Sequence, residues 1–414
     1  MQKVSITSEI GKLKKVIVHR PGTEIENMTP ETHKDLLFDD LLDLTTTQSE
    51  HDTFTSILKL HANVFEISKL LEEILNNEKL KEDLLRDLIL EMGVSLNLLD
   101  KIIHKPSKEL VESIILGVEK QVHLLTDFIS RNKYSFPPLP NLLFTRDIGV
   151  IINKHVLTGS MANKARATES IIMKYILSNH KDMISEGFYF DDTKEIYEYS
   201  KFEGGDFLIM RDDVLAVGLS ERTNSYAIDQ LIEKFRQKGT IQHLFVVILP
   251  KDRAMIHLDM VFTMLDTNLA CVHEPVILGN KNLGVVHIDI RERKNRFHKA
   301  NNLISALKKV GIVLETVPCG GHDKIIQERE QWMCGANLFT LAPGKVIGYA
   351  RNVNTFEQIE KIAGIPRIEA DDVLCGKVDL NTYDKYAIAF KGSELSRGGG
   401  GARCMTLPIL RDDL

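Results

Sequence analysis

The stretch DFLIMRDDVLAV, residues 206–217, contains two apolar runs on either side of a polar turn at residues 211–213. Apolar runs separated by a short polar turn predict a β-hairpin. The same plan returns around turns at residues 153–154, 266–268 and 342–345. A plan that recurs along the chain indicates a fold made of repeated units. The predicted strand pairs are 148–152 with 156–157, 207–210 with 214–217, 261–265 with 269–272, and 338–341 with 346–349.

Helices and further strands extend these hairpins. Apolar residues at helical spacing follow three of them, at residues 171–176, 228–235 and 356–362. A strand, strand, helix, strand module repeated around an axis predicts an α/β fold in the form of a propeller of mixed modules. Further strands are expected at 244–249, at 312–317 after a helix at 303–307, and at 16–19, where the opening strand would close the ring with the carboxyl-terminal segment.

Helical patterns interrupt this plan from about residue 70 to residue 135. The prolines of residues 137–140 end the interruption because they forbid helix. Residues 64–67 could still form a strand of the main body. We therefore expect one catalytic α/β domain, residues 1–414, with a helical insertion at approximately 70–135. One helical face is predicted from Leu70, Leu71, Ile74 and Leu75, and another from Val118, Val122, Leu125 and Ile129.

The composition indicates a chain that buries a core and carries no basic surface. Of its 414 residues 43% are hydrophobic, and the formal net charge is −6. A negative net charge argues against nucleic acid as a partner but suits a small cationic ligand. Apolar runs of about 18 residues, which a membrane span needs, are absent from the sequence. The oligomeric state, a homo-oligomer included, stays open.

The cysteines and the amino-terminal residues favour a cytoplasmic protein. Residues 1–22 lack the continuous apolar core of a signal peptide. The cysteines are odd in number, widely spaced and without a CxxC pair, which argues against a disulfide framework or a structural zinc site. They are Cys271, Cys319, Cys334, Cys375 and Cys404.

Acidic side chains precede three of the predicted hairpins. Asp147 comes before the first, Glu203 and Asp206 before the second, and His257 with Asp259 before the third. Equivalent strand starts converge on the axis of a ring of repeats, so these side chains can meet in one cavity. A single Asp in such a place is ordinarily a turn former, but its recurrence in three repeats favours a site.

A glycine run precedes the last cysteine. Residues 398–401 are four consecutive glycines, and Cys404 follows after Ala402 and Arg403. Glycines let the backbone approach a ligand closely. A phosphate-binding loop would need the GxxxxGK[ST] pattern, which this run lacks. A flexible loop is the structural alternative, and a reactive thiol at Cys404 is the functional one.

Four motifs in order along the chain resemble one known family. They are PNLLFTRD (140–147), FEGGD (202–206), HLDMVF (257–262) and RGGGGARCM (397–405), and the likeness begins at SEIGKLKKVIVHRPG (8–22). Together they resemble the arginine deiminases of the guanidino-group modifying, or pentein, superfamily. The resemblance implies a five-bladed α/β propeller with a helical insertion. It also implies hydrolysis of L-arginine to L-citrulline and ammonia, with no metal and no cofactor.

The resemblance assigns roles to individual residues. Cys404 is implied as the nucleophile that forms an amidino-thioester, and His257 as the general acid and base. Asp147 and Asp259 are implied to grip the guanidinium, and Glu203 to bind both the substrate and the histidine. Carboxylates suit this task because guanidinium is planar and always charged. The other implied substrate contacts are Asn141, Phe144, Arg166, Asp206, Arg222, Leu37 and Arg397, with Arg403 as an alternative to Arg397.

Three alternatives remain open. Another guanidino-modifying enzyme, a dimethylarginine hydrolase or an amidinotransferase, would share the fold, although the long helical insertion and the acid set favour the deiminase. An arginine-binding sensor would keep the acids and dispense with Cys404. A metal-dependent hydrolase would leave that cysteine incidental, and its ligands would be Glu203, Asp206, His257 and Asp259.

Overall fold

The four predicted hairpins are confirmed in the structure, a computed structural model that describes residues 4–94, 97–120, 125–129, 133–190, 195–292 and 294–414. Each is an antiparallel pair of largely buried strands. The pairs are β5 (Gly149–Ile152) with β6 (His155–Thr158), β7 (Phe207–Arg211) with β8 (Val214–Leu219), β10 (Phe262–Asp266) with β11 (Leu269–Val272), and β15 (Phe339–Ala342) with β16 (Lys345–Tyr349).

The predicted helices follow the hairpins in the structure. They are α7 (Ala167–Asn179), α8 (Ser225–Lys238), α10 (Leu303–Lys308) and α12 (Val353–Ala363). Polar side chains begin several of them, as when Asn224 accepts a hydrogen bond from the N–H of Ala227 at the start of α8. The remaining helices of this region are α9 (Glu274–Ile277), α11 (Lys324–Trp332) and α13 (Ala370–Leu374).

A strand parallel to the hairpin closes three of the repeats. These strands are β9 (His243–Ile248) beside β8, β14 (Glu315–Pro318) beside β11, and β18 (Tyr386–Phe390) beside β16, with β17 (Arg367–Glu369) at the edge. The strand predicted at residues 312–317 starts later than expected. Ile312 still belongs to the turn that ends α10, where its N–H donates to the carbonyl of Leu307 at 3.1 Å.

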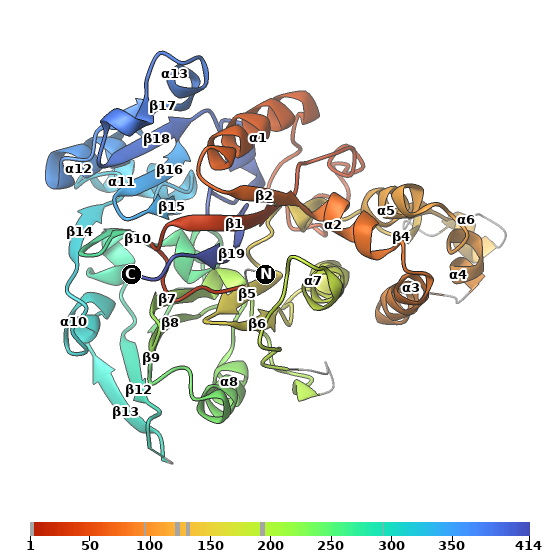
Figure 1. Cartoon of the computed structure of the whole chain (residues 1–414), viewed down its shortest axis with the longest axis horizontal. Helices are drawn as coiled ribbons and strands as arrows, with labels where there is room; N and C mark the ends of the chain where they lie inside the picture. Colours follow the sequence, from red (N-terminus) through yellow and green to blue (C-terminus); the bar gives the residue numbers. More distant parts are fainter. Residues whose placement is uncertain (1–3, 95–96, 121–124, 130–132, 191–194, 293) are drawn as a thin grey trace.

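The two ends of the chain share one sheet. β1 (Leu13–Val18) pairs antiparallel with β19 (Leu407–Arg411), with Ile17 opposite Leu407, and the two strands cross the middle of Figure 1. The prediction that the opening strand joins the carboxyl-terminal segment is confirmed. Of residues 64–67, left open above, 64–66 belong to β2 (Asn63–Glu66), which runs parallel to β1, and Ile67 begins the next helix.

The long connection of the third repeat adds two strands that the sequence analysis missed. β12 (Val285–Asp289) pairs with β9, and β13 (Arg296–Ala300) pairs with β12, so that this sheet has the order β13-β12-β9-β8-β7. The side chains of β13 are mostly exposed. An edge strand without a buried face has no alternation of apolar and polar residues by which it could be recognised.

Helices between β2 and β5 extend to one side of the sheets, at the right of Figure 1. The predicted helix through residues 118–129 is wrong in part. Val118 belongs to a short strand, Val122 lies outside the described residues, and among the described residues of this segment helix is present at 125–129. Gly117 ends the preceding helix with a φ of 86°. The elements are α2 (Ile67–Ile74), α3 (Glu78–Met92), α4 (Asn97–Ile102), α5 (Ser107–Leu116), α6 (Leu125–Ile129), and β3 (Val118–Glu119) paired with β4 (Tyr134–Phe136). Helix α1 (Leu44–Lys59) precedes β2.

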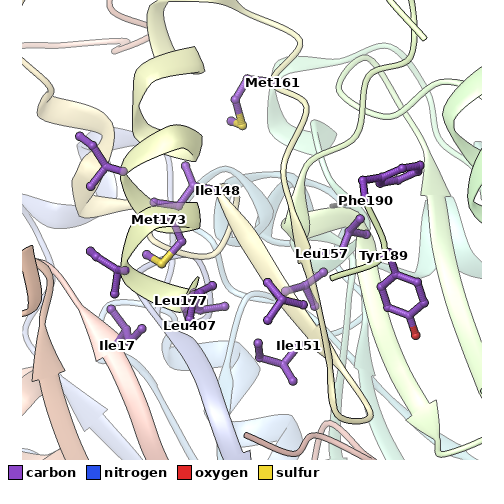
Figure 2. Close-up of a cluster of buried hydrophobic side chains, with 14 of the residues drawn as sticks. Ile17, Ile148, Ile151, Leu157, Met161, Met173, Leu177, Tyr189, Phe190 and Leu407 are labelled. Atoms are coloured by element: carbon purple, nitrogen blue, oxygen red, sulfur yellow. The ribbon is translucent and has the colours of Figure 1, made fainter. Parts of the chain in front are cut away.

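A buried cluster joins α7 to the strands beneath it. Figure 2 shows Met173 and Leu177 of α7 beside Ile17 of β1 and Leu407 of β19. Burying each such side chain contributes roughly 1.5–3 kcal/mol. This packing fixes β19 in place, and the residues just before β19 therefore have a rigid support. Among the described residues, the helices are all too short or too polar to cross a membrane.

Candidate functional site

Two matching turns position Glu203 and His257. Each residue immediately precedes a short 3-10 helix, η4 (Gly204–Asp206) and η6 (Leu258–Met260), which lead into β7 and β10. His257 Nε2 lies 3.0 Å from Glu203 Oε2, and both side chains are buried. The second and third repeats are therefore neighbours, and Glu203 orients the His257 ring.

Asp147 joins this pair from the first repeat. Its Oδ1 lies 3.5 Å from His257 Nδ1, and its Oδ2 accepts a hydrogen bond from Arg166. A Cβ atom on Gly205 would lie 2.7 Å from the His257 ring and 3.0 Å from Asp147. Glycine here does more than form a turn, because a larger residue would push these side chains apart.

Cys404 lies at the end of the glycine run, just before β19. Its Sγ is 4.0 Å from Asp259 Oδ2, and both side chains are buried. Asn337 holds the two residues together: its Oδ1 accepts from the N–H of Cys404 at 3.2 Å, and its Nδ2 donates to the carbonyl of Asp259 at 3.0 Å. A Cβ on Gly401 would lie 2.6 Å from Asn337 Oδ1. The last glycine of the run therefore permits this contact.

Burial and the neighbouring carboxylates set the charges of the cluster. Burial lowers the pKa of His257, but Asp147 and Glu203 outweigh it and raise the pKa to about 9. Burial raises the pKa of Cys404 well above its ordinary value, and Asp259 and Asp147 raise it further. Without a ligand the cluster holds an imidazolium and a thiol at neutral pH. A cation bound among the carboxylates would favour the thiolate.

A narrow cavity of about 30 Å³ lies against Cys404 and His257. Ligand pockets ordinarily measure roughly 300–1,000 Å³. In this conformation the cavity is therefore too small for a ligand of ordinary size. The cavity is lined by Leu37, Asn141, Phe144, Asp147, Arg166, Arg222, Arg253, Ile256, His257, Met260, Gly398, Gly399, Gly400 and Cys404.

Two arginines of the predicted set line this cavity. Arg166 donates to Asp147 and, at 2.8 Å, to Glu169, and it also donates to the carbonyls of Asn141 and Phe144 at 3.0 and 2.9 Å. Arg222 is held less firmly than Arg166, because its NH1 lies 3.5 Å from Glu203 Oε1. Both guanidinium groups therefore lie directly beside the acids of the cluster and offset part of their negative charge.

The structure does not bring every predicted residue to the cavity. Asp206 lies behind His257, where Ser220 Oγ and the N–H of Leu258 donate to it at 2.6 and 3.0 Å. Burial raises the pKa of Asp206 to about 7. Arg397 points outward and donates to Asp40 and Glu394 at 2.6 and 3.0 Å.

The sequence analysis missed Asn337 and Arg253. Asn337 stands directly before the fourth predicted hairpin, where the other repeats carry acids, so its position in the repeat could have identified it. Arg253 lines the cavity and donates to the carbonyl of Leu37 at 2.6 Å and to Asp39 at 3.0 Å. No pattern in the sequence links Arg253 to residues that lie more than 200 positions earlier.

Two carboxylate oxygens of the cluster have unmet hydrogen-bonding capacity. Asp147 Oδ1 and Asp259 Oδ1 are buried and accept no hydrogen bond from the described residues. Buried polar atoms in native proteins nearly always have a partner. Asp147 lines the cavity, Asp259 lies behind Cys404, and the free acceptors of both point to a ligand that donates hydrogen bonds and carries positive charge.

A metal ion is the other cation that such a cluster could hold. Asp147, Glu203 and His257 each offer one ligand atom, and these atoms lie within 4.8 Å of one another. Carboxylate and imidazole ligands suit zinc and related ions. Asp206 and Asp259, the further acids of the metal hypothesis, are not part of this group.

Comparisons with known proteins give the family. A family model described as arginine deiminase matches residues 34–411. The arginine deiminase of Limosilactobacillus reuteri is 34% identical over 429 residues, which cover 99% of this chain and 98% of that protein. The arginine deiminase of Bacillus thuringiensis is also 34% identical, over 432 residues and 99% of both chains.

Solved structures of lower identity share the fold. An amidinotransferase of saxitoxin biosynthesis from Microseira wollei is 13% identical, has a TM-score of 0.52 and covers 99% of this chain and 98% of its own. DDAH from Pseudomonas aeruginosa, solved in complex with citrulline, is 14% identical with a TM-score of 0.50, covering 96% and 99%. These likenesses confirm the predicted α/β class and the pentein fold. From the family model and the relatives of full length, the chain belongs to the arginine deiminase family, whose members hydrolyse amidine C–N bonds.

Proposed function

We propose that this chain hydrolyses L-arginine to L-citrulline and ammonia through a covalent amidino-thioester on Cys404. The observation that carries the proposal is that two buried oxygens, Asp147 Oδ1 and Asp259 Oδ1, accept no hydrogen bond from the described residues, while the other oxygen of Asp259 lies 4.0 Å from Cys404 Sγ. A guanidinium ion has donors in one plane that can satisfy both. Its positive charge offsets the burial of the two acids.

Substrate binding prepares the nucleophile. The bound guanidinium brings positive charge next to Cys404, whose pKa burial and the nearby acids otherwise raise. The thiol then releases its proton to solvent water, because His257 is already protonated, and the thiolate attacks the central carbon of the guanidinium. Cys404 regains this proton from solvent after the product has left. Holding that carbon between fixed carboxylates supplies position as well as charge.

His257 transfers the protons in both halves of the reaction. Its raised pKa keeps it protonated at neutral pH, so it can protonate the departing nitrogen as the C–N bond breaks and ammonia leaves. The neutral ring then takes a proton from water, which attacks the amidino-thioester carbon. The C–S bond breaks, the thiolate is restored, and citrulline is released. The proton that the guanidinium brought leaves with ammonia as ammonium.

The cavity also offers contacts for the amino-acid part of the substrate. Arg166 and Arg222 both line it, and of the two Arg222, held only at 3.5 Å from Glu203 Oε1, has donors left for the α-carboxylate. Asn141, Phe144 and Leu37 line the cavity as well. The proposal does not extend to Arg397, because its side chain is held by surface carboxylates.

We also infer that the sheets are the blades of a five-bladed propeller. The supporting observation is that the four hairpins lie in four different sheets and that β19, β1 and β2 form a further sheet. The helices at approximately 70–135 would then be an insertion between two blades.

A cytoplasmic location is part of the same proposal, since the described cysteines are all free thiols.

Citrulline formation from arginine tests the function. We expect the purified protein to form citrulline from arginine, measured over time with a colorimetric citrulline assay. EDTA should leave the rate unchanged. Cys404→Ser should abolish turnover while arginine still binds. The grouping of Asp147, Glu203 and His257 favours the metal hydrolase as second candidate. Activity lost in EDTA and kept in Cys404→Ser would establish that candidate instead, and binding without citrulline in the unmodified protein would indicate a sensor.

A further inference from the structure

Arg403 lies directly before Cys404 but turns away from the cavity. Its side chain is 1% exposed. It donates from NH1 to Asp259 Oδ2 at 2.8 Å and from NH2 to the carbonyl of Phe207 at 2.8 Å. Its Nε and NH2 each donate to one carboxylate oxygen of Glu9 at 3.1 Å. All three nitrogens of the guanidinium are therefore occupied by protein.

These bonds leave Asp259 with one free oxygen. Arg403 holds Oδ2, while Oδ1 has no hydrogen-bond partner among the described residues. Asn337 fixes the backbone of Asp259 through its carbonyl at 3.0 Å. A carboxylate held at its backbone and at one oxygen cannot rotate freely. The second oxygen is thus presented in one direction, as preorganised binding requires.

The same contact supports the charge of Asp259. Burial raises the pKa of Asp259, and the Arg403 guanidinium opposes that rise. A carboxylic acid that took up a proton here would bind a guanidinium poorly, because the ion pair would be lost. Several charged or titratable groups lie near Asp259 or near Arg403, its hydrogen-bond donor. They are Arg146, His257, Asp147, Cys404, Cys334, Glu9 and Arg411.

We propose that Arg403 is a positioning residue for the reaction, which holds Asp259 as an anion with one oxygen directed at the substrate guanidinium. Glu9, from the amino-terminal segment, fixes Arg403 in turn. This inference rests on the proposed function, since it assigns Asp259 to the guanidinium. It also answers which arginine of the RGGGGARCM motif serves the site: Arg403 acts through Asp259 without touching the substrate.

A double-mutant cycle tests this role. Arginine binding is measured by calorimetry in a Cys404→Ser background, alone and combined with Arg403→Met, with Asp259→Asn and with both. We expect Arg403→Met to weaken binding about ten- to a hundredfold, as the loss of a charged hydrogen bond would. In the Asp259→Asn protein the same change should have almost no further effect, because the residue it acts through is already neutral. A structural role would weaken binding equally in both backgrounds and would overturn the proposal.

Two further variants keep the test decisive. Arg403→Lys retains the positive charge and loses the paired hydrogen bonds of the guanidinium, so it should weaken binding less than Arg403→Met. If the Arg403→Met protein does not fold, Arg403→Lys replaces it in the double-mutant cycle. Arg211→Met removes a different arginine that pairs with Asp213, and it controls for a general loss of stability. If wild-type protein forms no citrulline, the proposed function fails. If it does and Arg403 and Asp259 contribute independently, the inference alone fails.

Discussion

The His257 ring is held between two carboxylates, one at each of its nitrogens. Glu203 accepts from Nε2 at 3.0 Å and Asp147 lies 3.5 Å from Nδ1. The resulting pKa of about 9 means that the imidazolium is the ground state at neutral pH. Since the first step needs a proton for the leaving nitrogen, this state suits a general acid.

The pH profile of Glu203→Gln follows from that arrangement. The amide keeps the shape but removes a negative charge, so the pKa of His257 falls and the protonated form is lost at lower pH. We expect the alkaline limb of kcat/KM, set near pH 9 in the wild type by His257, to move to lower pH. Citrulline production measured between pH 6 and pH 10 would show it. An unmoved alkaline limb would mean that another group sets it.

Asn337 provides a second prediction at a single residue. Its amide oxygen accepts from the N–H groups of Arg403 and Cys404, and its amide nitrogen donates to the carbonyl of Asp259. We expect Asn337→Leu to lower kcat by about ten- to a hundredfold. Without the amide, the thiol and the Asp259 carboxylate are free to shift, and a misplacement of about 1 Å can lower the rate about a hundredfold. Asn282→Leu, which removes a comparable side-chain bond to the carbonyl of Ile277, is the control. Equal kinetics of the two variants would contradict the assignment.

The sequence could predict the acids and the thiol but not how they are held. Asp147, Glu203 and His257 lie at repeat starts, so the pattern indicates that they meet. The orientation of Arg403 could not be predicted, because neighbouring side chains in a tight turn point in different directions. Its partner Glu9 is 394 positions away, and only the pairing of the two chain ends brings them together.

The glycine run is the element whose shape decides access to the thiol. A Cβ atom on Gly400 would lie 2.3 Å from the Phe144 ring and 3.1 Å from Cys404, whereas Gly399 has a φ of 87° and faces more open space. The run therefore serves two separate needs: close approach at one glycine and a left-handed backbone at its neighbour.

Gly400→Ala should abolish most activity while the protein stays folded. The added methyl group must displace Phe144 or Cys404, both of which line the cavity. Gly364→Ala is the matched control, because Gly364 ends α12 with a φ of 64° and nothing within 4 Å of the added atom. It should cost about 1 kcal/mol of stability and no activity. Citrulline assays and thermal unfolding of both variants would show whether activity and stability separate in this way.

Element prediction worked where burial leaves a pattern. The hairpin strands are buried, and their apolar runs are visible in the sequence; β13 is exposed and was missed. Gly117 ended a helix that apolar spacing alone would have continued. The predicted insertion at approximately 70–135 stays a prediction about domain organisation.

At the scale of the whole molecule, buried charges join distant segments near the amino-terminal strand. His19, just after β1, lies 3.1 Å from Glu24 and 3.0 Å from Glu66 of β2. Burial lowers its pKa, but hydrogen bonds to the two carboxylates outweigh that and raise the pKa to about 10. Nearby His51 has no hydrogen-bond partner among the described residues, and burial lowers its pKa to about 3.

These two histidines should affect stability with opposite dependence on pH. The folded pKa of His19 exceeds the ordinary value of about 6.5, so its contribution is complete below pH 6.5 and is lost as the pH rises towards 10. His19→Gln should therefore lower the free energy of unfolding by about a few kcal/mol at pH 6, and by progressively less as the pH rises towards 10. His51 is buried neutral, so its folding penalty appears only as the pH falls below 6.5. His51→Leu should gain stability relative to the wild type between pH 6 and pH 4, where His19→Gln shows its full loss. Urea unfolding of the three proteins from pH 4 to pH 10 measures both slopes. The stability difference between His19→Gln and the wild type should shrink above pH 6.5, and that between His51→Leu and the wild type should grow below pH 6.5; any other pattern would contradict the assignment of charge to His19 and neutrality to His51.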